Sequence, residues 1–420
     1  MRSPKGAPAR VGLFGLLGSG NLGNDASLEA VLGYLREDHP DAVVDALCGG
    51  AEVVTTRYGI PATRLHWFRG EYRTASRAGS VAAKGVGKLI DIVRTAAWVR
   101  GHDVVIVPGM GVLEATLPLR PWGFPYSLFL LCASGRLLGT RVALVSVGAA
   151  AIGNRPTRTL VRWSARLAAY RSYRDAPSRD AMRAMGVDTT RDEVYPDLAF
   201  SLPKPAAADV PSGPPAGPVC VGVMAFHGGD DDRSRAEEIH RRYLDGTIRF
   251  VRTLVEDGRP VRLLTGDRVD AEVVAAILDA VDSPLVTAAE TSSLDDLMKE
   301  MASVDTAVAI RYHNIISALK VGTPTLALSY AAKSEALMER MGLGAYSHPA
   351  REVDAARLLA QFRELEENAA DLRKTLAERN LIAAQQVKDQ FAALTAALFP
   401  DNVHPNTRSH DHDRSLRETP

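Results

Sequence analysis

The chain has 420 residues, of which 46% are hydrophobic and 24% charged, with 50 basic and 50 acidic side chains. This balance is typical of a soluble globular protein, and the length predicts two domains. Because the formal net charge is zero, the electrostatic argument for a nucleic-acid-binding protein fails, and we expect no nucleic-acid partner.

In the first half, apolar runs alternate with segments of helical periodicity, which predicts a parallel sheet with crossover helices. Strands are predicted at residues 11–15, 42–47, 104–108 and 142–147. Their nearly continuous Val, Leu and Ile content suits strands covered on both faces. Between the first two strands, one apolar stripe of a helix is formed by Leu28, Val31, Leu32 and Leu35. Residues 68–100 have a helical and basic pattern without clear ends.

The first predicted strand runs into a glycine-rich loop that carries Asn21, Asn24 and Asp25. Glycines allow the backbone to approach a ligand closely, and either Asn24 or Asp25 is predicted to cap the following helix. A dinucleotide site is only weakly supported, because polar side chains stand where a pyrophosphate requires bare backbone. A ligand-binding loop and a tight turn with a helix cap both remain open from this segment.

Two other strand ends in the first half carry candidate residues. Arg174 and Asp175 follow a short extended run and precede a helical segment. Arg174 can bind an anion while Asp175 orients it, or the two can form a structural ion pair, and the sequence leaves both open. The glycine-rich residues 108–111, after the strand at 104–108, are predicted to be a simple turn.

Residues 203–218 contain six prolines and no periodicity, which predicts a linker between domains at 1–202 and 219–350. In the second domain, strands are predicted at 219–224 and 261–265, and helices at 234–256, 271–281 and from about 293 onward. His227 follows the first of these strands and is expected to face the interdomain cleft. Residues 351–400 are predicted to be mainly helical, and 401–420 to be a disordered tail.

The strongest candidate site follows a strand predicted at 306–310. Arg311 and His313 stand at its carboxyl end, beside a helix predicted at 314–321, and Lys333 follows the next strand, at 325–330. Ligands of open α/β sheets bind at this edge. A guanidinium, an imidazole and an ammonium group near a helix N-terminus predict anion binding and proton transfer.

Targeting and metal-binding features are sparse. Cys48, Cys132 and Cys220 lie far apart and within or beside apolar runs, so we expect buried thiols, no disulfide framework, no metal and no cofactor.

Residues 1–10 lack the apolar core of a signal peptide, and the apolar patch at 124–133 is too short to span a bilayer. We expect a cytoplasmic protein, with peripheral membrane contact left open. Arginine-rich segments at 69–88 and 155–174 favour solvated helix faces over contact with lipid headgroups.

Five sequence elements occur in a distinctive order between about residues 11 and 345. They are Gly20-Asn21-Leu22-Gly23-Asn24-Asp25-Ala26, Arg174-Asp175-Ala176-Pro177-Ser178, Arg311-Tyr312-His313, Gly322-Thr323-Pro324 and Ser329-Tyr330-Ala331-Ala332-Lys333. In this combination the chain resembles the polysaccharide pyruvyl transferase family. It departs from the family pattern in the first loop, where Asn24 replaces the usual Asp and Asp25 the usual Glu.

The resemblance implies two Rossmann-like α/β domains in a GT-B-type arrangement, with the active site in the interdomain cleft. It implies that phosphoenolpyruvate is the donor and that a saccharide or lipid-linked saccharide of an exopolysaccharide or the cell envelope is the acceptor. On this view His313 and Arg311 are catalytic, and Arg174, Arg311 and Lys333 bind the donor. The acceptor or loop residues are Asn21, Asn24, Asp25 and His227.

Two alternatives remain open from the sequence. A GT-B glycosyltransferase that uses a nucleotide-sugar would share the architecture and an anion-binding second domain. A non-catalytic saccharide-binding relative would explain the altered pair Asn24 and Asp25, although the retention of Arg311, His313 and Lys333 argues against it. The sequence likewise leaves both directions of proton transfer by His313 open, protonation of the donor methylene or deprotonation of a sugar hydroxyl.

Overall fold

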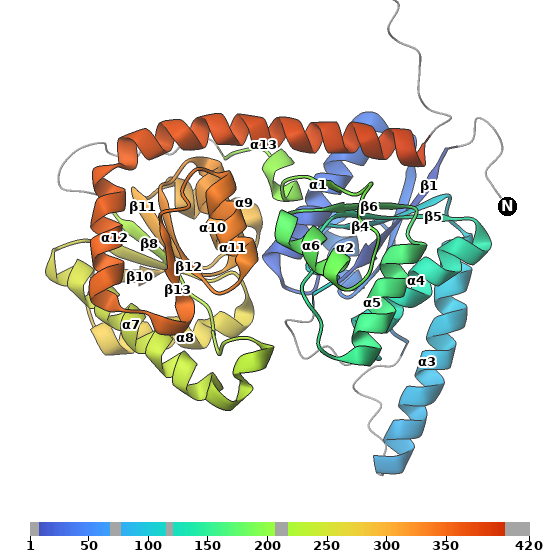
Figure 1. Cartoon of the computed structure of the whole chain (residues 1–420), viewed down its shortest axis with the longest axis horizontal. Helices are drawn as coiled ribbons and strands as arrows, with labels where there is room; N and C mark the ends of the chain where they lie inside the picture. Colours follow the sequence, from blue (N-terminus) through green and yellow to red (C-terminus); the bar gives the residue numbers. More distant parts are fainter. Residues whose placement is uncertain (1–7, 68–76, 115–120, 206–216, 400–420) are drawn as a thin grey trace, which may run out of the picture.

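The computed structural model describes residues 8–67, 77–114, 121–205 and 217–399, and it places two parallel α/β sheets side by side (Figure 1). The predicted proline-rich linker lies mostly outside the described residues, and so does the predicted tail. Each sheet is flanked by helices, as expected for buried parallel strands. Cys48, Cys132 and Cys220 are buried free thiols, which confirms the prediction for them.

In the described part of the first domain, seven parallel strands have the order β3-β2-β1-β4-β5-β6-β7. They are β1 (Arg10–Gly15), β2 (Val43–Cys48), β3 (Ala62–Arg64), β4 (Val104–Pro108), β5 (Arg141–Val147), β6 (Tyr170–Tyr173) and β7 (Glu193–Val194). The helices are α1 (Leu22–Asp38), α2 (Ala51–Tyr58), α3 (Arg77–Arg100), α4 (Phe124–Leu138), α5 (Arg155–Leu167), α6 (Ala176–Ala184) and the short 3-10 helix η1 (Leu198–Ser201). The order reverses between β1 and β4, which is where such sheets form ligand crevices.

In the described part of the second domain, six parallel strands have the order β10-β9-β8-β11-β12-β13. They are β8 (Val219–Gly222), β9 (Val261–Leu264), β10 (Val286–Ala288), β11 (Thr306–Ala309), β12 (Thr325–Ser329) and β13 (Ser347–Pro349). The helices and 3-10 helices are η2 (Asp230–Arg235), α7 (Ala236–Glu256), η3 (Arg268–Asp270), α8 (Ala271–Val281), α9 (Leu294–Ala302), α10 (Tyr312–Val321), α11 (Ala332–Arg340) and η4 (Ala350–Glu352). The switch between β8 and β11 repeats that of the first sheet.

The carboxyl-terminal region forms α12 (Ala355–Glu367) and the 30-residue α13 (Ala369–Leu398), which crosses from the second domain to the first (Figure 1). On the second domain, Nδ2 of Asn380 donates to the carbonyl of Leu319 at 2.8 Å. On the first domain, the ring of Phe391 stacks on Tyr34 with centroids 4.5 Å apart. Helix α13 therefore packs against both domains and connects them.

Gln390 on α13 is fully buried and joins two serines of the first sheet. Its amide nitrogen donates to Oγ of Ser172 at 2.8 Å, and its oxygen accepts from Oγ of Ser146 at 3.0 Å. We expect Gln390→Leu to lower the free energy of unfolding by about 1–3 kcal/mol, because the buried hydroxyls of Ser146 and Ser172 would each lose one hydrogen bond and keep those to Pro196 and to the N–H of Ser146. Denaturation by urea would measure this change.

The control is Gln385→Leu, at an exposed position of the same helix where the amide reaches only Asp389. We expect its midpoint to stay close to that of the unmodified chain. Equal midpoints for the two variants would contradict a structural role for the Gln390 bridge.

Candidate active site between the two sheets

The loop after β1 is fastened by its own polar side chains. Asn21 is the N-cap of α1, and its Oδ1 accepts from the backbone N–H groups of Gly23 and Asn24, each at 3.2 Å. The prediction that Asn24 or Asp25 caps this helix is therefore wrong. Both lie within its first turn, where Asp25 accepts from the N–H of Gly18 at 2.7 Å and Asn24 donates to the carbonyl of Leu16. The physical reason is that only Asn21 has the extended backbone of a capping residue.

Asp25 is buried, and burial is the largest cause of the raised pKa of its carboxyl group. Its hydrogen bond to Gly18, which adopts a left-handed backbone conformation, opposes that rise. Asn24 and Asp25, which depart from the family pattern, thus stabilise the conformation of the loop at the edge of the sheet where β1 ends.

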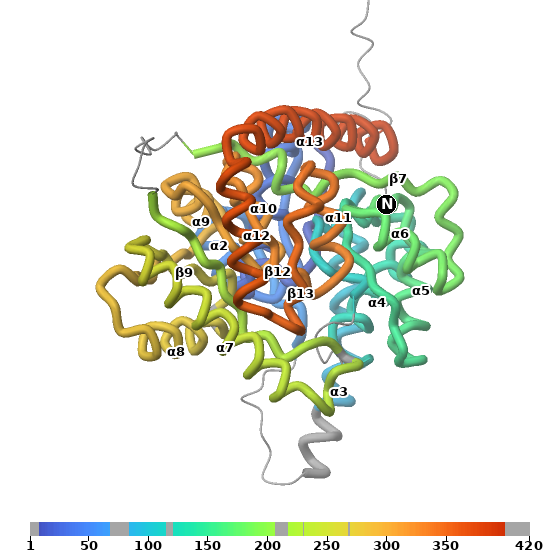
Figure 2. The backbone as a smooth tube through the Cα atoms, turned by 60° about the vertical axis from the view of Figure 1, so that its left-hand side comes forward, coloured from blue at the N-terminus to red at the C-terminus, as the bar shows by residue number. Residues whose placement is uncertain are grey.

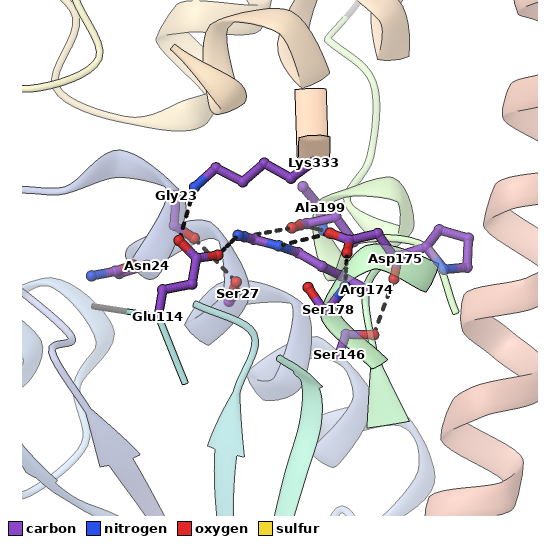
Figure 3. Close-up of polar contacts among 12 residues, drawn as sticks. Gly23, Asn24, Ser27, Glu114, Ser146, Arg174, Asp175, Ser178, Ala199 and Lys333 are labelled. Carbon is purple, nitrogen blue, oxygen red and sulfur yellow. Dashed lines mark hydrogen bonds and ion pairs between the residues drawn. The ribbon is translucent and has the colours of Figure 1, made fainter. Parts of the chain in front are cut away.

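Across the cleft, one carboxylate joins the two domains (Figure 3). Glu114, in the loop after β4, accepts from Nη2 of Arg174 at 2.6 Å and from Nζ of Lys333 at 2.9 Å. Arg174 follows β6, whereas Lys333 belongs to α11 of the second domain. Burial by itself would raise the pKa of Glu114, but the charges of Lys333 and Arg174 outweigh it and lower this pKa to about 2. Glu114 is therefore a carboxylate at neutral pH.

Arg174 is enclosed on all sides, with its side chain 3% exposed. Besides Glu114, its guanidinium lies 3.6 Å from a carboxylate oxygen of Asp175 and 3.7 Å from one of Asp197. It also lies over the ring of Tyr312, 4.5 Å from the centroid, in a cation–π contact with the second domain. Burial opposes the charge of Arg174, yet the surrounding carboxylates raise its pKa, so it stays a cation.

Arg311 is held by a bidentate ion pair. Its Nε and Nη2 donate to the two carboxylate oxygens of Asp270 at 2.7 and 2.6 Å. Asp270 is fully buried and also accepts from the N–H of Ala225. The backbone of Arg311 is extended and forms the N-cap of α10, so this helix begins two residues earlier than predicted. The Arg311 side chain is 22% exposed, and its remaining N–H groups can bind a ligand.

His313 lies in the first turn of α10 and reaches across the cleft to the first domain. Its ring packs against Gly23 of α1 so closely that a Cβ at Gly23 would overlap it. The close approach explains the glycine at this position. Figure 3 shows Gly23 beside Lys333 and Glu114, so the imidazole stands next to the ion-pair cluster. The elements that flank the cleft also touch, α1 against α9 and α6 against α11.

The surroundings of His313 lower the pKa of its imidazole to about 4. Burial is the largest cause, Asp197 opposes it, and the positive charges of Arg174, Lys333 and Arg311 add to it. His313 is therefore neutral at pH 7 in the ligand-free protein. A neutral imidazole can accept a proton directly, whereas it must first be protonated to donate one.

The lowered pKa of His313 makes stability depend on pH. Between the ordinary value of 6.5 and about 4, the unfolded chain binds a proton that the folded chain does not. Stability is therefore expected to fall, by an amount on the order of 1–3 kcal/mol, as the pH is lowered through this window. Thermal midpoints of the unmodified chain and of His313→Gln between pH 7 and pH 4 would measure it. Parallel curves for the two proteins would contradict this expectation.

The structure brings together most of the predicted site residues, but not all. The charges of Arg174, Arg311 and Lys333 all act on His313, whose ring packs against Gly23 in the first turn of α1. His227, by contrast, has a 43% exposed side chain that stacks on His240 at 4.2 Å and lies 4.0 Å from Glu237. Those contacts are on the second domain, and the described structure does not join His227 to the Glu114 cluster.

Sequence reasoning missed Glu114, Asp197, Tyr312 and Asp270 as site residues. Glu114 follows the glycine-rich loop after β4, which was interpreted as a simple turn, yet a polar residue after a strand-end loop was a usable signal. Asp197 offered no signal beyond its place before η1, where it accepts from the N–H of Ala199. Within the described residues, no cluster of three side chains has the make-up of a metal site.

The sequence was found to match a model of a known protein family. The model of the family described as polysaccharide pyruvyl transferase matches residues 21–331. No curated protein is significantly similar in sequence.

Solved structures are similar in fold. A putative UDP-N-acetylglucosamine 2-epimerase from Listeria monocytogenes is 13% identical, with a TM-score of 0.61 over 94% of this chain and 98% of that one. A lipopolysaccharide outer core galactosyltransferase is 10% identical, with a TM-score of 0.55 over 93% and 99%. These likenesses confirm the predicted GT-B arrangement of two Rossmann-like domains, and at such low identity they show the fold alone.

The family match includes the second, third and fourth sequence elements whole, the first from Asn21 and the fifth up to Ala331, and it extends over parts of both domains. The resemblance predicted from those elements is thus confirmed. This chain belongs to the polysaccharide pyruvyl transferase family.

Proposed function

We propose that the protein transfers the pyruvyl group of phosphoenolpyruvate to two hydroxyls of a saccharide, forming a ketal and releasing phosphate. The donor methylene carbon gains one proton and becomes a methyl group. Two sugar oxygens form bonds to C2, and the bond from C2 to the phosphate oxygen breaks. Of the two hydroxyl protons, one balances the new methyl group and the other leaves with the phosphate.

The observation that best supports this proposal is the accessible pair of cations beside a neutral imidazole. Lys333 and Arg311 are 16% and 22% exposed, and both act on His313 electrostatically. Phosphoenolpyruvate carries a carboxylate and a phosphate, which require such groups. In this assignment the Lys333 ammonium group gives up Glu114 and contacts the donor phosphate. Arg311 contacts an anionic group of the donor through one or two of its N–H groups.

Arg174 has a different part in the proposal. Because its side chain is enclosed, direct contact with the donor would require Glu114 to move away. We therefore assign two roles to Arg174. It positions Glu114, and it supplies positive charge near the donor without contacting it. This refines the expectation from the sequence, in which Arg174 bound the donor directly.

His313 is the proposed proton-transfer group. It is neutral in the ligand-free protein, and the negative charge of the donor would offset the cations that lower its pKa. If His313 protonates the methylene, binding of phosphoenolpyruvate at pH 7 takes up a proton. If it deprotonates a sugar hydroxyl, binding takes up none. Titration calorimetry in buffers of different ionisation enthalpy separates the two directions.

The proposed acceptor side is the first domain, where Asn21, Asn24 and Asp25 shape the loop opposite His313. A saccharide or lipid-linked saccharide of an exopolysaccharide or the cell envelope is the proposed acceptor. We propose in addition a cytoplasmic location with peripheral membrane contact and a role for His227 on the acceptor side. No helix in the described part of the chain is long and apolar enough to cross a bilayer.

The function is tested by calorimetric titration with phosphoenolpyruvate. We expect the unmodified chain to bind it and Lys333→Met to weaken binding by about ten- to a hundredfold, because a charge-assisted hydrogen bond is lost. Glu114 keeps Arg174 as its partner in this variant, so the fold should be retained. The control is Lys299→Met, an exposed lysine that pairs with Asp295 on α9.

The same titration distinguishes the alternative of a nucleotide-sugar enzyme. Among the proteins of similar fold is a UDP-GlcNAc 2-epimerase from Neisseria meningitidis bound to UDP-GlcNAc, 10% identical, with a TM-score of 0.58 over 93% of this chain and 99% of that one. Binding of UDP-GlcNAc without binding of phosphoenolpyruvate, with or without added saccharide, would overturn the proposal. Binding of neither would favour a non-catalytic relative.

A further inference from the structure

Asn314 lies in the first turn of α10, and its amide group is buried without a partner. The side chain is fully buried, and neither Oδ1 nor Nδ2 has a hydrogen bond to any residue that the structure describes. Such a group is rare in folded proteins, because an unsatisfied buried donor or acceptor is destabilising. A leucine would fill a similar space without that cost, so packing alone does not explain the amide.

The Asn314 amide is turned toward the carboxyl ends of the strands of the second sheet. A Cβ added at Gly222, the last residue of β8, would come to 2.6 Å from Nδ2, and one at Gly266, after β9, to 2.7 Å from Oδ1. The atom added at Gly266 would also lie 3.5 Å from Cβ and Cδ of Arg311. The strand order reverses between β8 and β11, so the amide lies at the point where sheets of this kind bind ligands.

The N-terminus of α10 at this point has no side-chain cap. Arg311 is its N-cap residue, but the Arg311 side chain makes no hydrogen bond to the first turn. The first backbone bond of the helix runs from the N–H of Ile315 to the carbonyl of Arg311 at 3.0 Å. The three N–H groups before Ile315 form the positive end of the helix dipole. A helix start of this kind, beside a guanidinium and a buried amide, is suited to an anion.

Helix α11 begins in a similar way after the neighbouring strand. Strands β11 and β12 are paired and parallel, and Figure 1 and Figure 2 both show α10 and α11 side by side. The N-cap residue of α11 is Ala331, which has no capping side chain. Ser334 occupies the same helical position as Asn314, and its buried hydroxyl has no hydrogen bond within the described part of the chain. Lys333 precedes it, so the two helix starts together suit a ligand with two anionic groups.

We propose that Asn314 is a ligand-binding residue whose amide donates to an anionic oxygen held at the N-terminus of α10. The anion enters the crevice beside Arg311, which is 22% exposed and has N–H groups left to donate. There the amide gains the partner that it lacks in the ligand-free protein, and its burial strengthens the bond.

The identity of the anion rests on the proposed function. With Lys333 of α11 on the phosphate of phosphoenolpyruvate, the carboxylate of the donor is the group at α10. The anion-binding role of Asn314 itself does not require this donor, because a nucleotide-sugar also carries phosphate groups. It can therefore hold or fail separately from the proposed pyruvyl transfer.

The test is calorimetric titration of the unmodified chain, Asn314→Leu and Asn314→Ala with phosphoenolpyruvate, inorganic phosphate and UDP-GlcNAc. We expect the affinity for phosphoenolpyruvate to fall about tenfold or more in both variants, because a hydrogen bond to an anion is lost. The affinity for inorganic phosphate should stay unchanged. The thermal midpoint of ligand-free Asn314→Leu should be equal to that of the unmodified chain or higher, since no buried amide is left without a partner.

The matched control is Asn368→Leu, where α12 meets α13. The Asn368 amide has partners, because it donates to Oη of Tyr346 at 3.2 Å and to the carbonyl of Glu364 at 2.9 Å. This variant should keep the affinity within about a factor of two, and its thermal midpoint should not rise. Weaker binding together with an unchanged or raised midpoint would thus distinguish Asn314 from an asparagine with a structural role alone.

The remaining outcomes also decide the question. Equal affinities of the unmodified chain and both Asn314 variants would overturn the inference, and so would the binding of none of the three probes. Equal weakening for phosphoenolpyruvate and inorganic phosphate would support Asn314 and place the phosphate at α10. Binding of UDP-GlcNAc alone, weakened in both variants, would support Asn314 while overturning the proposed pyruvyl transfer.

Discussion

Replacing Arg174 by methionine is expected to lower the free energy of unfolding by about 3–5 kcal/mol, the largest stability effect predicted for this chain. The guanidinium stands among the carboxylates of Glu114, Asp175 and Asp197, all of them at least nine-tenths buried. Without it, buried negative charges remain with too few partners, and Tyr312 of the second domain loses the nearer of two cations over its ring. Urea denaturation followed by tryptophan fluorescence and circular dichroism would measure the change.

Two further variants isolate the charge effect of Arg174. Arg183→Met, on α6 and 56% exposed, removes an arginine that pairs only with Asp180 at the surface and should change stability by less than about 1 kcal/mol. Adding Glu114→Gln to Arg174→Met removes one of the unpaired charges and should restore part of the lost stability. An unchanged midpoint for Arg174→Met would show that the cluster does not stabilise the fold.

His313→Gln is expected to lower turnover by a factor of about 10²–10⁴ while leaving the protein folded. Gln cannot exchange a proton near neutral pH, yet it fills a similar space beside Gly23. Affinity for phosphoenolpyruvate should change little, because Lys333 and Arg311 remain in place. The measurement is phosphate release from phosphoenolpyruvate in the presence of a saccharide selected by an acceptor screen.

The comparison for this variant is His66→Gln, which alters a histidine of the first domain that pairs with Asp91 of α3. It should leave turnover within about a factor of two, since positions away from the reacting groups act only indirectly. Near-normal turnover in His313→Gln would remove His313 from the proposed mechanism and direct attention to the sugar hydroxyls or solvent as the proton source.

The fold could be predicted well wherever local patterns and burial agree. The strand at 104–108 was predicted with the bounds that β4 has, because its apolar run is covered on both faces. Likewise the helical pattern around 271–281 corresponds to α8, and Ser293 begins α9 by accepting from the N–H of Asp296. Several strand ends differ by one or two residues, and the errors that affect the candidate site fall at helix starts. In α1 and α10 the capping residue is Asn21 or Arg311, and cap choice depends on the backbone conformation of the loop before the helix.

For the candidate site too, some features could be predicted from the sequence and others only from the folded structure. By itself, the sequence determined the two α/β halves, the family, and the position of Arg311, His313 and Lys333 at strand ends, because these follow from periodicity and from residue order. Only the tertiary structure decided that Glu114 pairs with Lys333, 219 positions away, and that Arg174 is enclosed rather than open to a ligand. Charge pairing and burial depend on distances in space, and chain order does not specify these until both domains have folded against each other.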